Sequence, residues 1–436
     1  MERGLENAVL SEALNYPLAK CTTRTRKPQQ EESHEEGKEE EEMGRRKGKK
    51  TQVKRRDYGK GTRHEIITLA LACGCLPYRR LALLGMNTKT VRKKIHEMCN
   101  EGVMEIYHKD DVWLAGIKDY AEKNEEYRNE VDGKLHRYYA RFGMPDYKRA
   151  RYAKDADGAR VIKNAESYMF MYGVGLNCVL GEKISLRSQN ETDFEKMRNS
   201  YYTSREVKGY DHYTADKGTD NVLSTTRING LVVCDGGTYP VYHTGNSTQK
   251  YTRSGEKKIE VYINRMLTMK KKAPLRGAIL LATNLKTYKD IIIPKTRQIG
   301  DQLSNMEGVY EHVYGFTLDE EGQRMMRLLR IPEWDTVVYE EMLGMERRNG
   351  RTGIMECDGQ RGNVYYFCYC VPDIKRFKMF LRRAELEKDK SRYRIFCFDT
   401  QETFLKEVAG QYAQIHSTSF EEFCKAHSLT AERTPE

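Results

Sequence analysis

The sequence predicts a mixed α/β protein made of more than one folded part, and two observations lead to this fold class. Between residues 63 and 115, the spacing of apolar residues changes from helical periodicity to the alternation of short strands. From about residue 200 onward, a strand followed by a helix recurs along the chain. A length of 436 residues is too great for one ordinary domain and fits two or three.

The stretch 63–86 predicts two helices. Residues 63–74 (RHEIITLALACG) supply apolar side chains along a first helix. Pro77 fits the first turn of a second helix, because its ring presets φ and its missing N–H would lack a partner there in any case. Gly85 fits the left-handed position at which this second helix would end.

A third helix is predicted from Thr88 to Asn100. The side chain of Asn87 or Thr88 can cap it by accepting a hydrogen bond from a free backbone N–H. Helical spacing places one apolar stripe on the buried side, formed by Val91, Ile95 and Met98. The other sides of the helix carry Lys89, Arg92, Lys93 and His96.

After Gly102, residues 104–107 and 112–114 predict two short strands around the tip 108–111. Three helices and a hairpin in this order make a winged helix-turn-helix. In that fold the third helix enters the major groove of DNA, and the hairpin lies over the backbone or the minor groove. The two aspartates of the tip argue against its contact with phosphate. The other interpretation is a winged helix that binds protein, with lysines that only solvate an outer face.

Charge runs and helical patterns set the remaining boundaries. An acidic block (31–42) precedes a basic block (45–56), and blocks of like charge cannot bury apolar surface. The basic block is either an arm that grips phosphate or a solvated linker. We therefore predict a disordered charged tail in 1–60, the winged helix-turn-helix in 61–116, a helical connector in 117–199, an α/β domain in 200–415 and a C-terminal tail in 416–436.

The predicted α/β domain begins with a hairpin and continues as strand-helix units. Residues 231–234 and 239–242 form the hairpin around Asp235. Four later apolar runs end at Asn, Asp or Pro just before a helix begins, which indicates a mainly parallel sheet covered by helices. These runs are AILLAT, YEHVYGFTL, VYYFCYCV and YRIFCF.

Composition limits the classes of partner and cofactor. The formal net charge of +11 and the pI of about 8.9 fit a polyanionic partner. No apolar run approaches the ~20 residues that cross a bilayer, and the N-terminus lacks the pattern of a secretory signal, so we expect a cytoplasmic protein with no membrane partner. Eleven cysteines include no C-x-x-C pair, which favours buried free thiols over a metal site. No phosphate-binding glycine loop occurs, so no nucleotide cofactor is expected.

Magnesium-dependent DNA cleavage is the enzymatic alternative. It requires carboxylates near a strand pair to hold Mg²⁺, with a lysine beside the attacking water. However, Asp235 is expected in a turn, and the strand 239–242 is followed by His243 where a metal site needs an acid. The sequence therefore favours a protein without catalytic or metal-binding residues. If it is a nuclease, the candidates are Asp235, Glu256, Glu260 and Lys258.

Several stretches resemble the replication-relaxation family of plasmid and conjugative-element proteins. They are MNTKTVRKKIHEMCNEGV, ARVIKNAESYMFMYGVG, YYTSREVK, TTRINGLVV with YPVYHTGN, and FCFDTQETFLKEVAGQYA, within residues 60 to 415. The resemblance implies a winged helix that binds DNA and a domain related to restriction endonucleases. At the positions similar to the family's acidic motifs, residues 228–230 and 242–245, both acids are missing. The resemblance thus implies a degenerate nuclease-like domain that serves as a DNA or protein platform.

Together these patterns predict a non-catalytic DNA-binding accessory protein of a plasmid or conjugative mobile element, acting in replication, relaxation or transfer. Its partner would be double-stranded DNA, with replication or transfer proteins of the element as further partners. Two alternatives are the nuclease and an assembly protein that uses its winged helix for protein contacts. The predicted DNA-binding residues are Lys89, Thr90, Arg92, Lys93 and His96 in the third helix and Lys54, Arg55 and Arg56 in the arm, with Arg45 and Lys47. A second basic surface would involve Arg205, Lys208 and Arg227.

Overall fold

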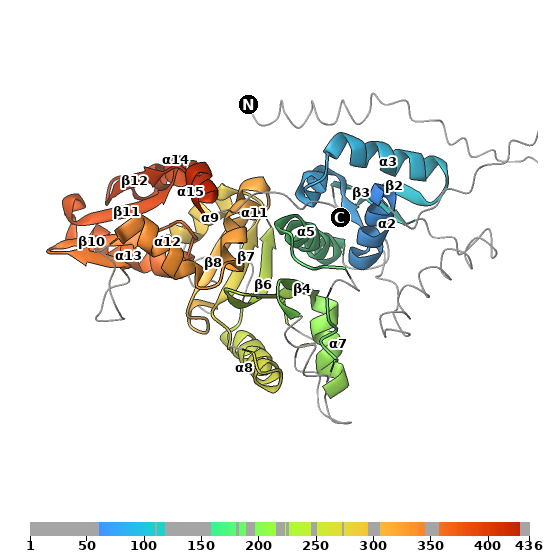
Figure 1. The fold of residues 1–436 in the computed structure, drawn as a ribbon, viewed down its shortest axis with the longest axis horizontal. Coiled ribbons are helices and arrows are strands. Elements are labelled where there is room, and N and C mark those ends of the chain that lie inside the picture. The colour runs from blue at the N-terminus through green and yellow to red at the C-terminus, as the bar shows by residue number, and fades with distance from the viewer. Residues whose placement is uncertain are drawn as a thin grey trace, which may run out of the picture. The chain divides into compact units, whose positions relative to one another are not determined.

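The structure is a computed structural model in which α-helices and mixed β-sheets alternate along the chain (Figure 1). The described residues all belong to one compact unit, Asp57–Glu436. The predicted tail with Lys54, Arg55 and Arg56, as well as Arg45 and Lys47, lies outside the described residues. The structure describes residues 61–109, 111–117, 158–179, 183–188, 197–214, 223, 226–245, 251–272, 274–294, 306–344 and 357–427, with backbone alone for Leu71, Ile117 and 211–214.

The N-terminal elements are two α-helices separated by a two-residue strand and a 3-10 helix, followed by a hairpin, so the predicted second helix is a 3-10 helix. The third helix, α3, has the predicted bounds, and the Asn87 side chain accepts a hydrogen bond from the Thr90 N–H at 3.1 Å. Gly85 ends the preceding turn with a left-handed φ of 69°. The elements are α2 (Gly61–Cys73), β1 (Leu76–Pro77), the 3-10 helix η1 (Tyr78–Leu84), α3 (Thr88–Asn100), β2 (Met104–Lys109) and β3 (Val112–Ile117).

Two details of this part differ from the prediction. The hairpin strands continue nearly to the tip, so that Lys109 pairs with Val112. Pro77 belongs to the two-residue strand β1, which pairs with β3 and makes a three-stranded sheet in the order β1-β3-β2. The strand periodicity near Pro77 is too short to detect in a sequence, because two residues do not establish an alternation.

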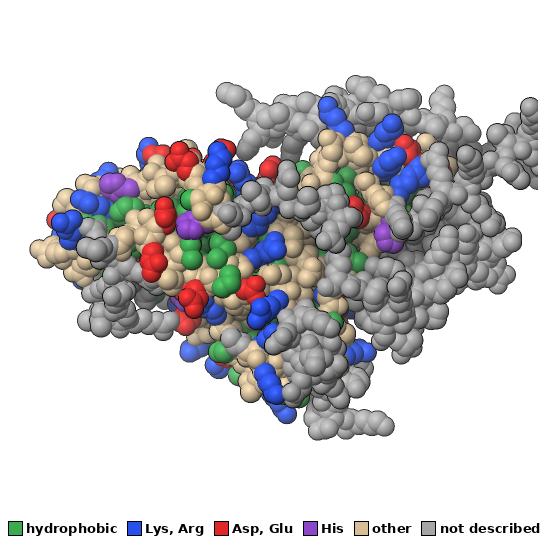
Figure 2. Space-filling model, viewed as in Figure 1, with side chains coloured by type: hydrophobic (Ala, Val, Ile, Leu, Met, Phe, Trp, Pro, Cys, Tyr) green, Lys and Arg blue, Asp and Glu red, His purple; other side chains and the backbone are tan. Residues whose placement is uncertain are grey.

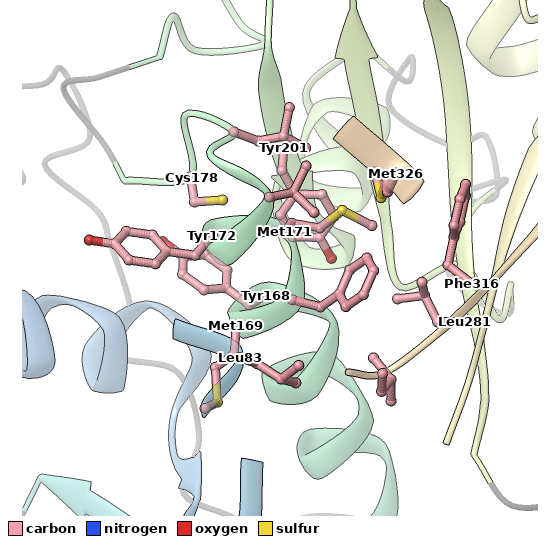
Figure 3. Close-up of a cluster of buried hydrophobic side chains, with 14 of the residues drawn as sticks. Leu83, Tyr168, Met169, Met171, Tyr172, Cys178, Tyr201, Leu281, Phe316 and Met326 are labelled. Carbon is pink, nitrogen blue, oxygen red and sulfur yellow. The ribbon is translucent and has the colours of Figure 1, made fainter. Parts of the chain in front are cut away.

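Helix α5 (Gly158–Val174) lies in the centre of the larger of the two described hydrophobic cores. The sequence predicted a single apolar stripe on a helical connector, but all residues from Ala165 to Tyr172 are buried. The helix packs against η1 and β1 and also against β4, β6 and α11. Figure 3 shows its side chains Tyr168, Met169 and Met171 among residues from those neighbours. A helix covered on several sides is buried all round rather than along one stripe.

The first large sheet has five strands in the order β4-β5-β6-β7-β8. The pairs β4-β5 and β5-β6 are antiparallel, whereas β6-β7 and β7-β8 are parallel. Side chains alternate between its two faces, so that Val241 faces the core of α5 and Tyr242 faces a second core. The strands are β4 (Ser200–Thr203), β5 (Gly230–Cys234), β6 (Gly237–Gly245), β7 (Ala278–Ala282) and β8 (Val313–Thr317), and the helices are α7 (Ser204–Thr214), α8 (Arg253–Met269), α9 (Leu285–Ile292), α11 (Glu320–Arg327), η3 (Leu328–Arg330) and α12 (Trp334–Leu343).

A second sheet of four strands follows, in the order β12-β11-β10-β9. Strands β10, β11 and β12 are parallel, and β9 pairs antiparallel to β10. The expected mainly parallel sheet is therefore two mixed sheets, because apolar runs predict strands but not their partners. The elements, which extend past residue 415, are β9 (Gly359–Arg361), β10 (Val364–Cys368), α13 (Ile374–Glu387), η5 (Lys390–Arg392), β11 (Tyr393–Phe398), α14 (Asp399–Ala409), β12 (Gln414–Thr418) and α15 (Phe420–Ala426).

One side chain of α11 joins η1 to α5. The amide nitrogen of Gln323 donates to the Leu83 carbonyl at 2.7 Å and to the Phe170 carbonyl at 3.0 Å. Gly173 makes this approach possible, since a Cβ there would lie 2.0 Å from the Leu83 oxygen. The N-terminal elements therefore share hydrogen bonds, as well as a hydrophobic core, with the larger sheet.

Replacing Gln323 with Met preserves the length of the side chain and removes both N–H donors. Two buried carbonyls then lack a partner, so we expect the free energy of unfolding to fall by about 2 kcal/mol in urea denaturation. Gln360→Met is the control, because the Gln360 amide donates to Gly362 in an exposed contact. Equal losses in the two variants would contradict a special role for Gln323.

Candidate functional site

The outer surface of α3 carries exposed basic side chains in its N-terminal half. Lys89, Thr90 and Lys93 are exposed, while the predicted stripe of Val91, Ile95 and Met98 is fully buried. The buried stripe fixes the rotation of the helix, and the Asn87 cap fixes its first turn. Figure 2 shows Lys and Arg side chains over the region that α3 occupies in Figure 1.

The other two predicted residues of α3 turn toward Tyr78. The Arg92 guanidinium lies over the Tyr78 ring, 5.3 Å from its centroid. The Nε2 atom of His96 lies 3.1 Å from the Tyr78 hydroxyl. Burial, and then the charge of Arg92, lower the pKa of His96, which disfavours the charged imidazole. Lys89 and Lys93 are thus better placed than Arg92 and His96 to contact a ligand.

Acidic residues occupy the C-terminal half of α3 and are paired within the fold. Arg63 of α2 contacts both Glu97 and Glu101, at 2.8 Å in the Glu101 pair. Lys94 also contacts Glu97 at 3.1 Å. Because the carboxylates are paired, the charge of α3 that faces outward is concentrated at its N-terminal half.

The hairpin beside α3 presents an aromatic pair near its tip. Trp113 is 41% exposed, and its ring centroid lies 5.1 Å from that of His108 on the neighbouring strand. Val112 and Leu114, which point to the other face of the strand, are buried. The hairpin therefore has a packed inner face and an outer face with exposed indole surface.

A buried polar cluster lies where β6 ends, on the side of the sheet covered by α5. Glu166 of α5 has one carboxylate oxygen 2.9 Å from Nε2 of His243 and the other 3.3 Å from Nε of Arg80. Arg80 also donates to the Leu318 carbonyl at 3.1 Å. Burial alone would raise the pKa of the Glu166 carboxyl, but the hydrogen bond from His243 and the charges of Arg80 and Arg79 hold it below its ordinary value.

The hydrogen bonds of His243 define its tautomer. Its Nδ1 accepts the Gly245 N–H at 2.9 Å, so the ring proton is on Nε2 and is donated to Glu166. The imidazole is then neutral with both nitrogens occupied. Such a histidine is held in place as a donor and is not available as a metal ligand.

Two asparagines and a lysine extend the cluster. The Asn229 oxygen accepts the His243 backbone N–H at 2.8 Å, and the Asn229 amide nitrogen donates to the Asn164 oxygen at 2.8 Å. The Lys163 ammonium donates to the Thr244 carbonyl at 3.2 Å. The structure thus brings together residues 229 and 243, which the sequence singled out as positions without acids.

The nuclease candidates do not meet at one place. Asp235 lies in the hairpin turn, beside Arg198 and Asn199. Glu256 is on α8 and accepts a hydrogen bond from Tyr242, which points to the opposite face of the sheet from His243. Glu260 pairs with Lys257 at 2.6 Å, and Lys258 is exposed on the same helix. Among the described residues, no group of three or more His, Cys, Asp or Glu side chains could hold a metal ion.

Glu256 belongs to a buried chain of hydroxyl groups. Tyr242 donates to it, and the Tyr242 and Tyr310 hydroxyls are 2.7 Å apart. Burial raises the pKa of the Glu256 carboxyl to about 7, although Tyr242 and the charge of Arg227 act to lower it. Glu256 and Glu166 are therefore two buried carboxyls with opposite shifts in pKa.

Comparisons with known proteins identify no relative: no family model, no curated protein and no solved structure matches this chain. The described helices also include none that is both apolar enough and long enough to cross a membrane.

The sequence did not reveal Glu166, Arg80 or Asn164 as members of the cluster. Their partners are far away in the chain: His243 is 77 positions from Glu166. The available signal was a glutamate inside an otherwise apolar run, ESYMFMYG, where a buried charge requires a partner.

Glu166→Gln tests the charge at the centre of the cluster. The variant has one acceptor oxygen for two donors and leaves Arg80 without a counter-ion, so we expect a loss of about 3 kcal/mol in unfolding free energy at pH 7. Because the folded pKa of Glu166 is lowered, this stabilisation is lost as pH falls, and the difference should shrink below about pH 4. Glu320→Gln, on an exposed residue of α11, is the control. A constant difference from pH 7 to pH 3 would refute the ionic role.

Glu256→Gln should have the opposite effect. The folded pKa of about 7 lies above the unfolded value, so the wild-type protein loses stability as pH rises from about 4.5 to about 7. The neutral amide keeps an acceptor for Tyr242 and avoids a buried charge. We expect the variant to be more stable by up to about 3 kcal/mol at pH 8 and equal to wild type near pH 4. Urea denaturation at the two pH values measures this, and a destabilised variant at pH 8 would contradict it.

Proposed function

We propose that this chain is a DNA-binding accessory protein without nuclease activity, of the kind carried by plasmids or conjugative elements. In this proposal residues 61–117 form a winged helix-turn-helix, with α3 as the recognition helix and β2-β3 as the wing. Double-stranded DNA is the partner, and replication or transfer proteins of the element are further partners.

The observation that carries the proposal is the exposed N-terminal half of α3. Recognition helices meet base edges and phosphates with their N-terminal residues. Lys89, Thr90 and Lys93 are exposed there, while the acids of the same helix are paired to Arg63 and Lys94. The helix therefore offers DNA a cationic end whose direction is fixed by packing.

The wing supports the same proposal by its exposed Trp113. A large exposed aromatic side chain next to a basic helix suits contact with the sugar and base surfaces of nucleic acid. Asp111 at the tip has a left-handed φ of 59° and is exposed, so the aromatic pair is a better contact than the tip itself.

The second part of the proposal is the absence of cleavage. Metal-assisted hydrolysis of a phosphodiester needs carboxylates that hold Mg²⁺ near the scissile bond. Asp235 and Glu256 are separated along β6 and across the sheet, and the cluster at the end of β6 has an amide and a neutral imidazole in their place. No contact among the described residues favours the nuclease alternative.

Lys89→Glu with Lys93→Glu should weaken duplex binding in a salt-dependent way. Each phosphate contact contributes about 0.9 to the slope of log affinity against log salt, so losing two should lower the slope by about 1.8. Affinity near 0.1 M salt should fall on the order of tenfold to a hundredfold. Anisotropy of a labelled duplex at several salt concentrations measures both quantities.

The control for this variant is Arg382→Glu with Lys388→Glu, which makes the same charge change on exposed residues at α13. Tryptophan emission provides a second readout, since the chain has two tryptophans and Trp334 is only 2% exposed. Quenching by duplex should disappear in Trp113→Phe. Equal affinity of the α3 and α13 variants would favour the assembly alternative, and cleavage of DNA with Mn²⁺ would favour the nuclease.

A further inference from the structure

A second group of basic side chains lies apart from α3, around the segment 226–229 that leads into β5. Two come from α5 (Arg160 and Lys163), one from α7 (Lys208), and one from the segment itself (Arg227). We call these four residues the α5–α7 cationic cluster.

Three hydrogen bonds bring together the segments that carry these residues. The Lys208 ammonium donates to the Thr226 carbonyl at 3.0 Å, which ties α7 to the segment. The bond of 2.8 Å between Asn229 and Asn164 ties the segment to the first turns of α5. Lys163, adjacent to Asn164, reaches the Thr244 carbonyl at the end of β6. The carboxyl ends of parallel strands, where β6 and β7 end here, are a common location for ligands in α/β proteins.

Two cations of the cluster, Arg160 and Lys208, repel each other. Burial, and then the nearby charge of Arg160, lower the pKa of Lys208 to about 8. Arg160 and Arg227 are exposed, and neither forms an ion pair with an acidic residue of the described part of the chain. A bound anion would relieve this repulsion, because opposite charge favours the protonated amine.

Two nearby acids, Glu206 and Glu166, are engaged with other partners, whereas the charge of Arg227 acts on Glu256. Glu206 of α7 pairs with Lys183 at 2.8 Å. Glu166 pairs with His243 and Arg80, and Glu256 is buried against Tyr242. Asn164 and Asn229, which bond to each other beside Lys163 and Arg227, are uncharged amides and do not repel an anion.

We propose that the α5–α7 cationic cluster binds the phosphate groups of a nucleic-acid strand, and that it does so without a metal ion. This site is separate from α3 and adds a second contact on the α/β part of the chain. The side chains fit phosphate oxygens because guanidinium groups offer paired N–H donors and ammonium groups offer compact charges. We expect the ligand to be a strand rather than a single phosphate group, because four cations are more than one phosphate group requires.

The test uses the full chain, a short labelled oligothymidylate and fluorescence anisotropy. Arg160→Gln with Arg227→Gln removes two exposed charges and should weaken binding roughly tenfold or more at low salt. Arg382→Gln with Lys388→Gln is the matched control and should leave affinity within about twofold. EDTA should not change the wild-type affinity. A thermal melt confirms that each variant is folded.

Two further arms separate this site from α3 and from small phosphate ligands. In the Lys89→Glu, Lys93→Glu background, oligothymidylate binding should persist and should still fall on adding Arg160→Gln and Arg227→Gln. Thymidine 5′-monophosphate should compete only weakly. The proposal is overturned if the cluster and control variants bind equally, if EDTA abolishes binding, or if the mononucleotide competes as well as the strand. The affinity of the Lys89→Glu, Lys93→Glu variant for duplex DNA tests the proposed function separately from this inference.

Discussion

The buried carboxylate of Glu166 is the interaction on which the arrangement of the described chain depends. A charge taken out of water to this extent is costly unless both oxygens find strong donors. Here the donors are Arg80 of η1 and His243 of β6, which are 86 and 77 residues away in the sequence. If either Arg80 or His243 moves, one oxygen of the buried Glu166 carboxylate loses its donor. The N-terminal elements and the five-stranded sheet are therefore held by one charge as well as by apolar packing.

This connection has a consequence for how DNA would be held. Helix α3 follows η1 directly, and η1 is fixed by Arg80 and by the Gln323 bond to Leu83. The basic end of α3 and the α5–α7 cationic cluster thus belong to one packed unit rather than to domains on a flexible linker. The two proposed nucleic-acid contacts on one frame would restrict the path of a bound strand, because a frame that does not adapt makes the strand bend or open instead.

Features of the fold that depend on residues close together in the chain could be predicted from the sequence. The bounds of α3 follow from its Asn87 cap and its buried stripe, and the starts of α9, α11 and α13 follow from Asn284, Asp319 and Asp373, whose side chains accept backbone N–H bonds there. Pairing of strands and burial of single charges depend on residues far apart in the chain, and no local pattern records them. For this reason the split into two mixed sheets, the all-round burial of α5 from Ala165 to Tyr172 and the role of Glu166 emerge only from the structure.

Cleaving a phosphodiester and binding it without cleavage require different side chains at the end of β6. A metal-dependent nuclease places carboxylates there, and those carboxylates repel phosphate until a divalent ion bridges them. In this chain a neutral His243 lies at the end of β6 with Asn229 bonded to its backbone N–H, while Lys163 donates to the Thr244 carbonyl there and Lys208 donates to the Thr226 carbonyl beside Arg227. Asn229 and His243 carry no carboxylate. They therefore provide no acidic ligand for a metal ion and no negative charge to offset the nearby cations. We infer that the side chains at this position favour holding a strand over cutting it.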